Sequence, residues 1–182
     1  SGENVIIERN HFRNYSFGVM IKLGNVSQKG IRNTTIRNNL FENIGTDKVQ
    51  FNADIFVNGA GRPETHGKIT KLDIFNNTHS SKSLAGLMII GLKRVDTLVG
   101  LKYINNIVTN IRSHGYVTLD GNAGHIDSFV IRNNMSFNNA RGNEISYENG
   151  AAPPAHYTHF NSIKKDPKLN KDFRLNAGSP AI

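Results

Sequence analysis

Acidic and amide side chains recur at the ends of short apolar stretches of this sequence. The pairs are Asn58-Gly59, Asp120-Gly121 and Glu148-Asn149, with Gly24-Asn25 in the equivalent place. If these stretches stack as neighbouring strands, Asp120 and Glu148 become neighbours at a spacing of about 5 Å. Two carboxylates that close favour a bound metal ion or a raised pKa. The alternative is that Asp-Gly and Asn-Gly simply form turns, as such dipeptides readily do.

Basic residues lie near the same stretches. Lys22, Lys93 and Arg94 are the nearest, and His114 precedes the stretch that ends at Asp120. Removal of a proton next to a carboxylate requires a base and a cation, and these residue types supply both. His114 paired with Asp120 has the form of an acid/base group with a carboxylate that orients it. The alternative for the Lys and Arg residues is an ordinary solvated basic edge.

The other histidines give weaker signals. His156 and His159 are three residues apart, which without a helix is a weak indication of a metal pair. His79 occupies a position that Phe12, Phe41 and Val108 fill in similar segments, so we expect it to pack rather than to react. The histidines therefore identify no metal site, and the metal stays unknown.

Composition limits the classes of partner. The 182 residues carry a net charge of +8, which favours polyanions, and no apolar run approaches the ~18 residues of a membrane helix. The basic residues are spread along the chain without an aromatic stacking platform, so nucleic acid is not the expected partner. There is no cysteine, which excludes disulfides and thiolate metal sites. Asn accounts for 25 residues, far above ordinary usage.

Many of the asparagines belong to an internal repeat. Five segments align: NVIIERNHFRN, NTTIRNNLFEN, KLDIFNNTHSS, GLKYINNIVTN and SFVIRNNMSFN. The second residue of the central pair falls at Asn10, Asn39, Asn77, Asn106 and Asn134, at steps of 29, 38, 29 and 28 residues. The longer step is expected to hold a loop insertion near GTDKVQ and GRPETHGK. A fixed period of this size is typical of solenoid proteins.

The aligned columns predict how each repeat folds. A large apolar residue stands three positions before the second Asn in every copy: Ile7, Ile36, Ile74, Tyr103 and Ile131. Alternation with one fixed face predicts a half-buried strand, and a second short strand follows about 11 residues after the pair. Asn39, Asn77, Asn106 and Asn134 are expected to stack at one turn and to hydrogen-bond along the axis.

The repeat and the ending together resemble the right-handed parallel β-helix proteins of the pectin-lyase-like superfamily. The signature I-x-N-N-x-F-x-N is cleanest from Ile36 to Asn43, and DPKLNKDFRLNAGSPAI, from Asp166 to Ile182, looks like the closing segment of such proteins. We therefore expect an all-β, right-handed, single-stranded parallel β-helix of about five coils, with ~28–29 residues per coil. Residues 1–182 would form one domain, closed by residues 150–182. The chain would be the C-terminal part of a longer β-helix, with further residues or a leader before Ser1.

The resemblance implies extracellular work on polysaccharides, in a secreted or cell-surface protein. One hypothesis is binding or cleavage of an acidic polysaccharide, by a polysaccharide lyase or a glycoside hydrolase if the chain is active. The other hypothesis is a non-catalytic β-helix that serves as a surface fibre, a tailspike or a carbohydrate-binding scaffold. No complete catalytic motif of the superfamily is present, so the sequence leaves the two open. An uncapped end of the helix would permit self-association.

These considerations define the candidate site. Asp120, Lys22 and His114 are the candidate catalytic residues. The candidate substrate-binding residues are Asn58, Lys93, Arg94 and Glu148. Carboxylates and cations together could hold a uronate directly or through Ca²⁺, the one cofactor that the resemblance suggests.

Overall fold

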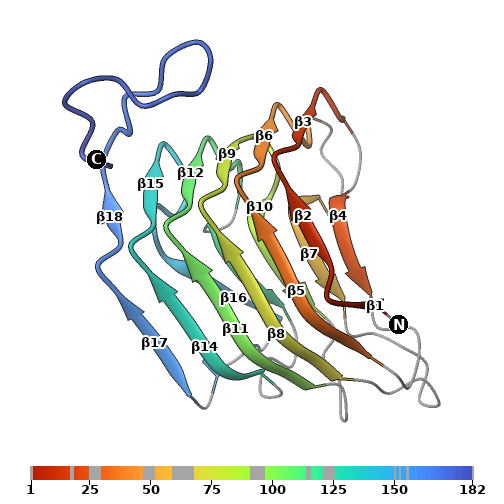
Figure 1. Cartoon of the computed structure of the whole chain (residues 1–182). Helices are drawn as coiled ribbons and strands as arrows, with labels where there is room; N and C mark the ends of the chain where they lie inside the picture. The colour runs from red at the N-terminus through yellow and green to blue at the C-terminus, as the bar shows by residue number, and fades with distance from the viewer. Residues whose placement is uncertain are drawn as a thin grey trace.

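The computed structural model describes residues 2–16, 19–24, 30–46, 52–58, 68–90, 97–113, 116–120, 126–149, 151, 153–154 and 156–181. The chain winds into a parallel β-solenoid whose coils follow one another along a single axis (Figure 1). Only strands and turns occur among these residues, and none of them forms a helix that could cross a membrane.

Three parallel sheets form the walls. The first sheet consists of β1 (Gly2–Glu3), β2 (Ile6–Glu8), β5 (Ile31–Arg37), β8 (Lys68–Phe75), β11 (Thr97–Ile104), β14 (Ile126–Arg132) and β17 (Tyr157–Phe160). The second consists of β3 (His11–Arg13), β6 (Leu40–Glu42), β9 (Thr78–Ser80), β12 (Ile107–Thr109), β15 (Met135–Phe137) and β18 (Ile163–Lys164). The third consists of β4 (Val19–Gly24), β7 (Ala53–Asn58), β10 (Ala85–Ile90), β13 (Val117–Asp120) and β16 (Ile145–Glu148).

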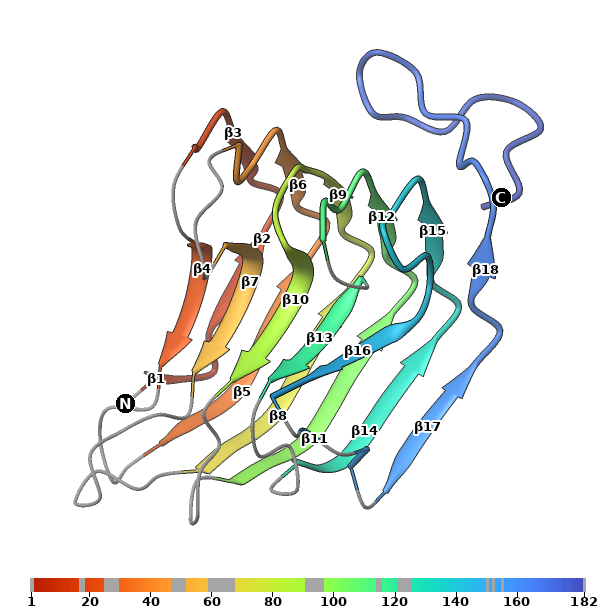
Figure 2. The ribbon, with the colours of Figure 1, turned by 180° about the vertical axis from the view of Figure 1, so that it is seen from behind.

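The chain passes through the three sheets in the same order in each coil, which confirms the all-β parallel solenoid that the sequence predicts. Every strand in a sheet pairs in parallel with the equivalent strand of the next coil. About four turns separate the first and last strands of the third sheet, slightly fewer than the expected five coils. In Figure 2, which is turned by 180° from Figure 1, this sheet faces the viewer and ends at β16.

Two details differ from the expectation. The strands of the second sheet were not predicted separately, because three residues are too short to display a period of two. The coil pattern also continues into the expected closing segment, where β17 and β18 extend two of the sheets. In the tail beyond β18, residues 172–175 form no strand, and Leu175 makes an isolated bridge with Leu169.

The predicted apolar column lies in the core. Ile36, Ile74, Tyr103 and Ile131 have no exposed surface and pair in register from coil to coil. Strands of one sheet lie about 4.8 Å apart, so each side chain packs directly on its equivalent. Much of the lumen of the solenoid is thus filled by repeated contacts between like positions.

The two asparagines of each pair have different structural roles. The first takes a left-handed backbone conformation, with φ near +55° at Asn38, Asn76, Asn105 and Asn133. Asn tolerates this conformation better than most residues, so it can turn the chain between the first and second sheets. The second Asn is buried at this corner, which we call the Asn corner.

The buried asparagines form the predicted hydrogen-bonded ladder. Asn106 Oδ1 accepts the backbone N–H of Asn77 at 3.0 Å and its side-chain Nδ2–H at 3.1 Å. Asn106 Nδ2 donates in turn to Asn134 Oδ1 and to the backbone carbonyl of Ile74. The same pattern links Asn10 to Asn39 and Asn39 to Asn77. Each amide therefore satisfies backbone groups that the turn would otherwise leave buried without partners.

We predict that Asn106→Ala lowers the free energy of unfolding by about 1–3 kcal/mol, because Asn77 N–H and the Ile74 carbonyl lose buried partners. Urea denaturation followed by circular dichroism measures the effect. Asn105→Gly is the matched control, since it keeps the left-handed turn and leaves the ladder intact. Equal stability of Asn106→Ala and the parent protein would show that the ladder is dispensable.

Candidate functional site

Backbone pairing brings together some of the residues that were predicted to form a column at the ends of the third-sheet strands. Gly24 pairs with Asn58, and Asp120 pairs with Glu148. Asn58 and Asp120 are not neighbours, however, because Ile90 pairs with both of them and lies between. The polar column is therefore interrupted by an apolar residue.

The chemistry of this column rests mostly on side chains that are not described. Lys93, Arg94 and His114 lie outside the described residues, and Lys22, Asn58 and Asp120 are described only by their backbones. Glu148 is half-buried and forms an ion pair with Arg141 at 2.9 Å. No group of three or more His, Asp or Glu side chains in the described part of the chain could hold a metal ion. The catalytic and calcium hypotheses for this column stay predictions.

His156 and His159, which are three residues apart, have different partners. The exposed His156 ring bonds to the Asp127 carboxylate, and this bond lowers the pKa of Asp127. His159 Nε2 lies 2.8 Å from the Tyr116 hydroxyl, and burial lowers the pKa of His159. The two rings are thus directed to different groups.

A polar cluster that the sequence analysis did not identify lies inside the solenoid. His79 Nδ1 is 2.9 Å from Asp54 Oδ2, and the Ser81 hydroxyl donates to the same oxygen at 2.9 Å. Ser83 is within hydrogen-bond distance of Ser81 and donates to the carbonyl of Ala85. All four side chains are buried.

This cluster contains the residue types of a hydrolase triad without its geometry. The Ser81 hydroxyl bonds to the carboxylate rather than to the imidazole, and no member of the cluster has access to solvent. The His79 ring stacks on Phe41 at 4.6 Å, in the column where packing was predicted. Burial, together with Tyr116 and Asp54, raises the pKa of the nearby Tyr103. The cluster is a structural part of the core.

Solvent-accessible charged and polar side chains lie on the outer face of the first sheet. We use the name charged groove for a hollow of about 410 Å³ on this face. It is lined by Asp73, Phe75, Asn76, Lys102, Ile104, Asn105, Val130 and Arg132. The apolar side chains come from adjacent strands β8, β11 and β14, and the cations come from β11 and β14. An apolar floor, two cations, two amides and the Asp73 carboxylate therefore face the same space.

The two cations of the charged groove differ in their ion pairing with the described residues. Arg37 bonds to Glu8 at 2.6 Å and lies over the ring of Phe75. Lys102 lies 3.7 Å from Asp73, a weak contact for an exposed pair. Arg132 is exposed and forms no ion pair with any residue that the structure describes. An anion in the groove could therefore pair with Arg132 and compete for Lys102.

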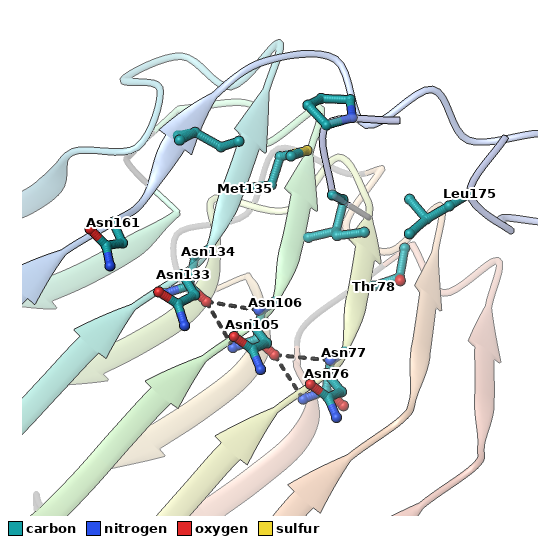
Figure 3. A pocket seen from close by; sticks show the side chains of 14 residues that line it. Asn76, Asn77, Thr78, Asn105, Asn106, Asn133, Asn134, Met135, Asn161 and Leu175 are labelled. Carbon is teal, nitrogen blue, oxygen red and sulfur yellow. Dashed lines mark hydrogen bonds between the residues drawn. The ribbon is translucent and has the colours of Figure 1, made fainter. Parts of the chain in front are cut away.

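A second hollow lies around the Asn corner, and we call it the Asn cleft. Its volume is about 560 Å³, and Figure 3 shows its lining. Asn76, Asn105 and Asn133 form a row beside the hydrogen-bonded ladder, while Leu175 belongs to the C-terminal tail. The Asn cleft shares Asn76 and Asn105 with the charged groove. A further hollow of about 340 Å³ continues along the corner past Asn38.

Comparison with known proteins adds no relative. No family model, no curated protein and no solved structure matches the chain. The resemblance to the pectin-lyase-like superfamily therefore stays a prediction, whereas the parallel solenoid rests on the strand pairing.

The sequence did contain signals for the groove and the cluster. Outward positions of the first sheet alternate with the apolar column, so Phe75, Lys102 and Arg132 could have been assigned to one surface. Asp54 interrupts the apolar stretch ADIFV, which marks a buried charge in need of a partner. Its pairing with His79 could not be derived, because it joins two different sheets.

We predict that His79→Phe lowers the free energy of unfolding by roughly 3–5 kcal/mol, because it leaves the buried Asp54 carboxylate with one fewer partner. Phe fits the column geometrically, since Phe41 occupies the equivalent position one coil earlier. The double variant Asp54→Asn/His79→Phe should recover part of the loss in urea denaturation. A stable His79→Phe protein would contradict this account of the cluster.

Proposed function

We propose that this protein binds an extended acidic polysaccharide along the outer face of its first sheet. The observation that supports the proposal is the charged groove, where Lys102 and Arg132, the latter without an ion-pair partner among the described residues, flank an apolar floor. The net charge of +8 favours the same class of partner. Localisation outside the cell, as a secreted or surface protein, is part of this proposal.

The groove suits a uronate polymer for three reasons. Arg132 and Lys102 are charge partners for carboxylates, and Arg can bind a carboxylate through two parallel hydrogen bonds. Phe75, Ile104 and Val130 offer apolar surface to the C–H faces of sugar rings. Asn76 and Asn105 offer donors and acceptors to hydroxyl groups. Equivalent positions repeat about every 4.8 Å along the axis but differ in side chain, because Asp73, Lys102 and Val130 occupy one column of the groove, so successive sugars would meet different groups at a regular spacing.

Binding is better supported than cleavage. Asp73 is the only carboxylate that lines the charged groove, and it lies beside Lys102. A hydrolase of the usual kind needs two carboxylates that flank the scissile bond. A carbohydrate-binding scaffold thus requires fewer assumptions than an enzyme, although a lyase that uses the predicted Asp120 column stays an alternative. Unsaturated products that absorb ultraviolet light would identify such a lyase.

Calorimetry with alginate, polygalacturonate and chondroitin sulfate tests the proposal. We predict that at least one of these polymers binds and that Arg132→Gln weakens binding about five- to tenfold, because a charged hydrogen-bond donor is removed. Increasing salt should weaken binding to the parent protein more than to the variant.

Arg112→Gln is the matched control, because it removes the same charge outside the charged groove. If Arg132→Gln and Arg112→Gln weaken binding equally, net charge alone accounts for the affinity and the groove is not the site. If none of the polymers binds, the proposed function is wrong and the purely structural role is favoured.

Self-association through an open end of the solenoid is a further part of the proposal. The carbonyls of His156 and Phe160 accept the N–H groups of Phe129 and Asn133 in the preceding coil, so the backbone groups of Tyr157 and His159 point to the opposite edge of β17. Phe160 and Ile163, in the same coil, are exposed. An open edge with exposed apolar groups favours pairing with another chain. We predict a molar mass that rises with concentration in light scattering, and a constant monomer mass would exclude it.

A further inference from the structure

The lining of the Asn cleft differs in kind from that of the charged groove. None of its fourteen residues is charged, although the chain as a whole is strongly basic. Asn, Thr and apolar side chains make up the surface. A charged ligand group placed there would lose its hydration without gaining an ionic partner, which is unfavourable. The chemistry of the cleft therefore selects an uncharged ligand.

One wall of the cleft presents amides with unused hydrogen-bonding capacity. The left-handed residues Asn76, Asn105 and Asn133 succeed one another at intervals of one coil. Their side chains make no hydrogen bond with the described residues, whereas the adjacent Asn77, Asn106 and Asn134 are engaged in the ladder. The row thus offers donors and acceptors held at a fixed repeat of about 4.8 Å.

The other wall is apolar. Ile107 and Met135 follow the Asn pair, Ile163 follows Asn161-Ser162 in the next coil, and the three residues pair in register. Leu175 and Pro180 of the tail add to this side.

The tail is a structured part of this wall. The bridge between Leu169 and Leu175 closes a loop, and the Ser179 hydroxyl donates to the Pro167 carbonyl at 2.7 Å. Asp166 Oδ1 accepts the N–H of Lys168, which fixes the turn that leaves the last coil. The wall is thus formed before any ligand arrives.

We propose that the Asn cleft binds a neutral glycan. A pyranose ring presents hydroxyl groups at its edge and C–H groups on its face, which matches an amide row opposite an aliphatic wall. A glycan chain along the axis places successive rings beside successive asparagines. The cleft adjoins the charged groove through Asn76 and Asn105, whereas Asn133, Met135 and Leu175 line the cleft alone.

Affinity electrophoresis through gels that contain dextran, laminarin or galactomannan tests this inference. At least one of these neutral polymers should retard the parent protein. Asn133→Gly should weaken that interaction about five- to tenfold, because it removes an amide donor and acceptor. Glycine keeps the positive φ of this position, so the turn is preserved.

Asn43→Gly is the matched control, since Asn43 also has a positive φ but does not line the cleft. Arg132→Gln should leave the retardation unchanged, and Asn133→Gly should leave binding of the acidic polymers unchanged. The inference is overturned if no neutral polymer retards the protein or if Asn133→Gly behaves like Asn43→Gly. Neither result bears on the charged groove, whose own test uses acidic polymers and Arg132→Gln.

Discussion

The hydrogen-bonded ladder at the Asn corner is the interaction on which the other features of this structure depend. A solenoid turn must bury backbone groups, and each Asn side chain supplies both a donor and an acceptor to the neighbouring coil. Because every Asn depends on the next, the coils must be in register at this corner. The register in turn aligns the apolar columns of the lumen and the outward columns of the first sheet.

Both candidate grooves are consequences of that register. The side chains of the charged groove belong to three neighbouring coils, and none of these coils could form it alone. The Asn cleft lies directly beside the ladder, since the residue that turns the chain precedes the residue that bonds along the axis. Charged and uncharged surfaces therefore lie next to each other on one molecule while remaining chemically distinct.

The sequence predicts the features that repeat and misses those that do not. The Ile36 column and the Asn106 ladder follow from spacing, because residues at the same position of adjacent repeats become neighbours in the structure. The interruption of the Asp120 column by Ile90 was also open to prediction, had every coil been aligned there. Contacts between different sheets, such as Asp54 with His79, have no periodic signal. The position of the tail over the Asn corner has none either, because its residues occur once.

The coil between Asn39 and Asn77 contains 38 residues, yet its ladder bonds, both 3.0 Å, match those of the 29-residue coil that follows, at 3.0 and 3.1 Å. The length of chain in a coil is thus independent of the distance that the coil spans along the axis. Insertions away from the corner can vary in sequence and size without changing the spacing of the surfaces. Loops can therefore be added to such a molecule one at a time while the axial spacing of its outer side chains stays constant.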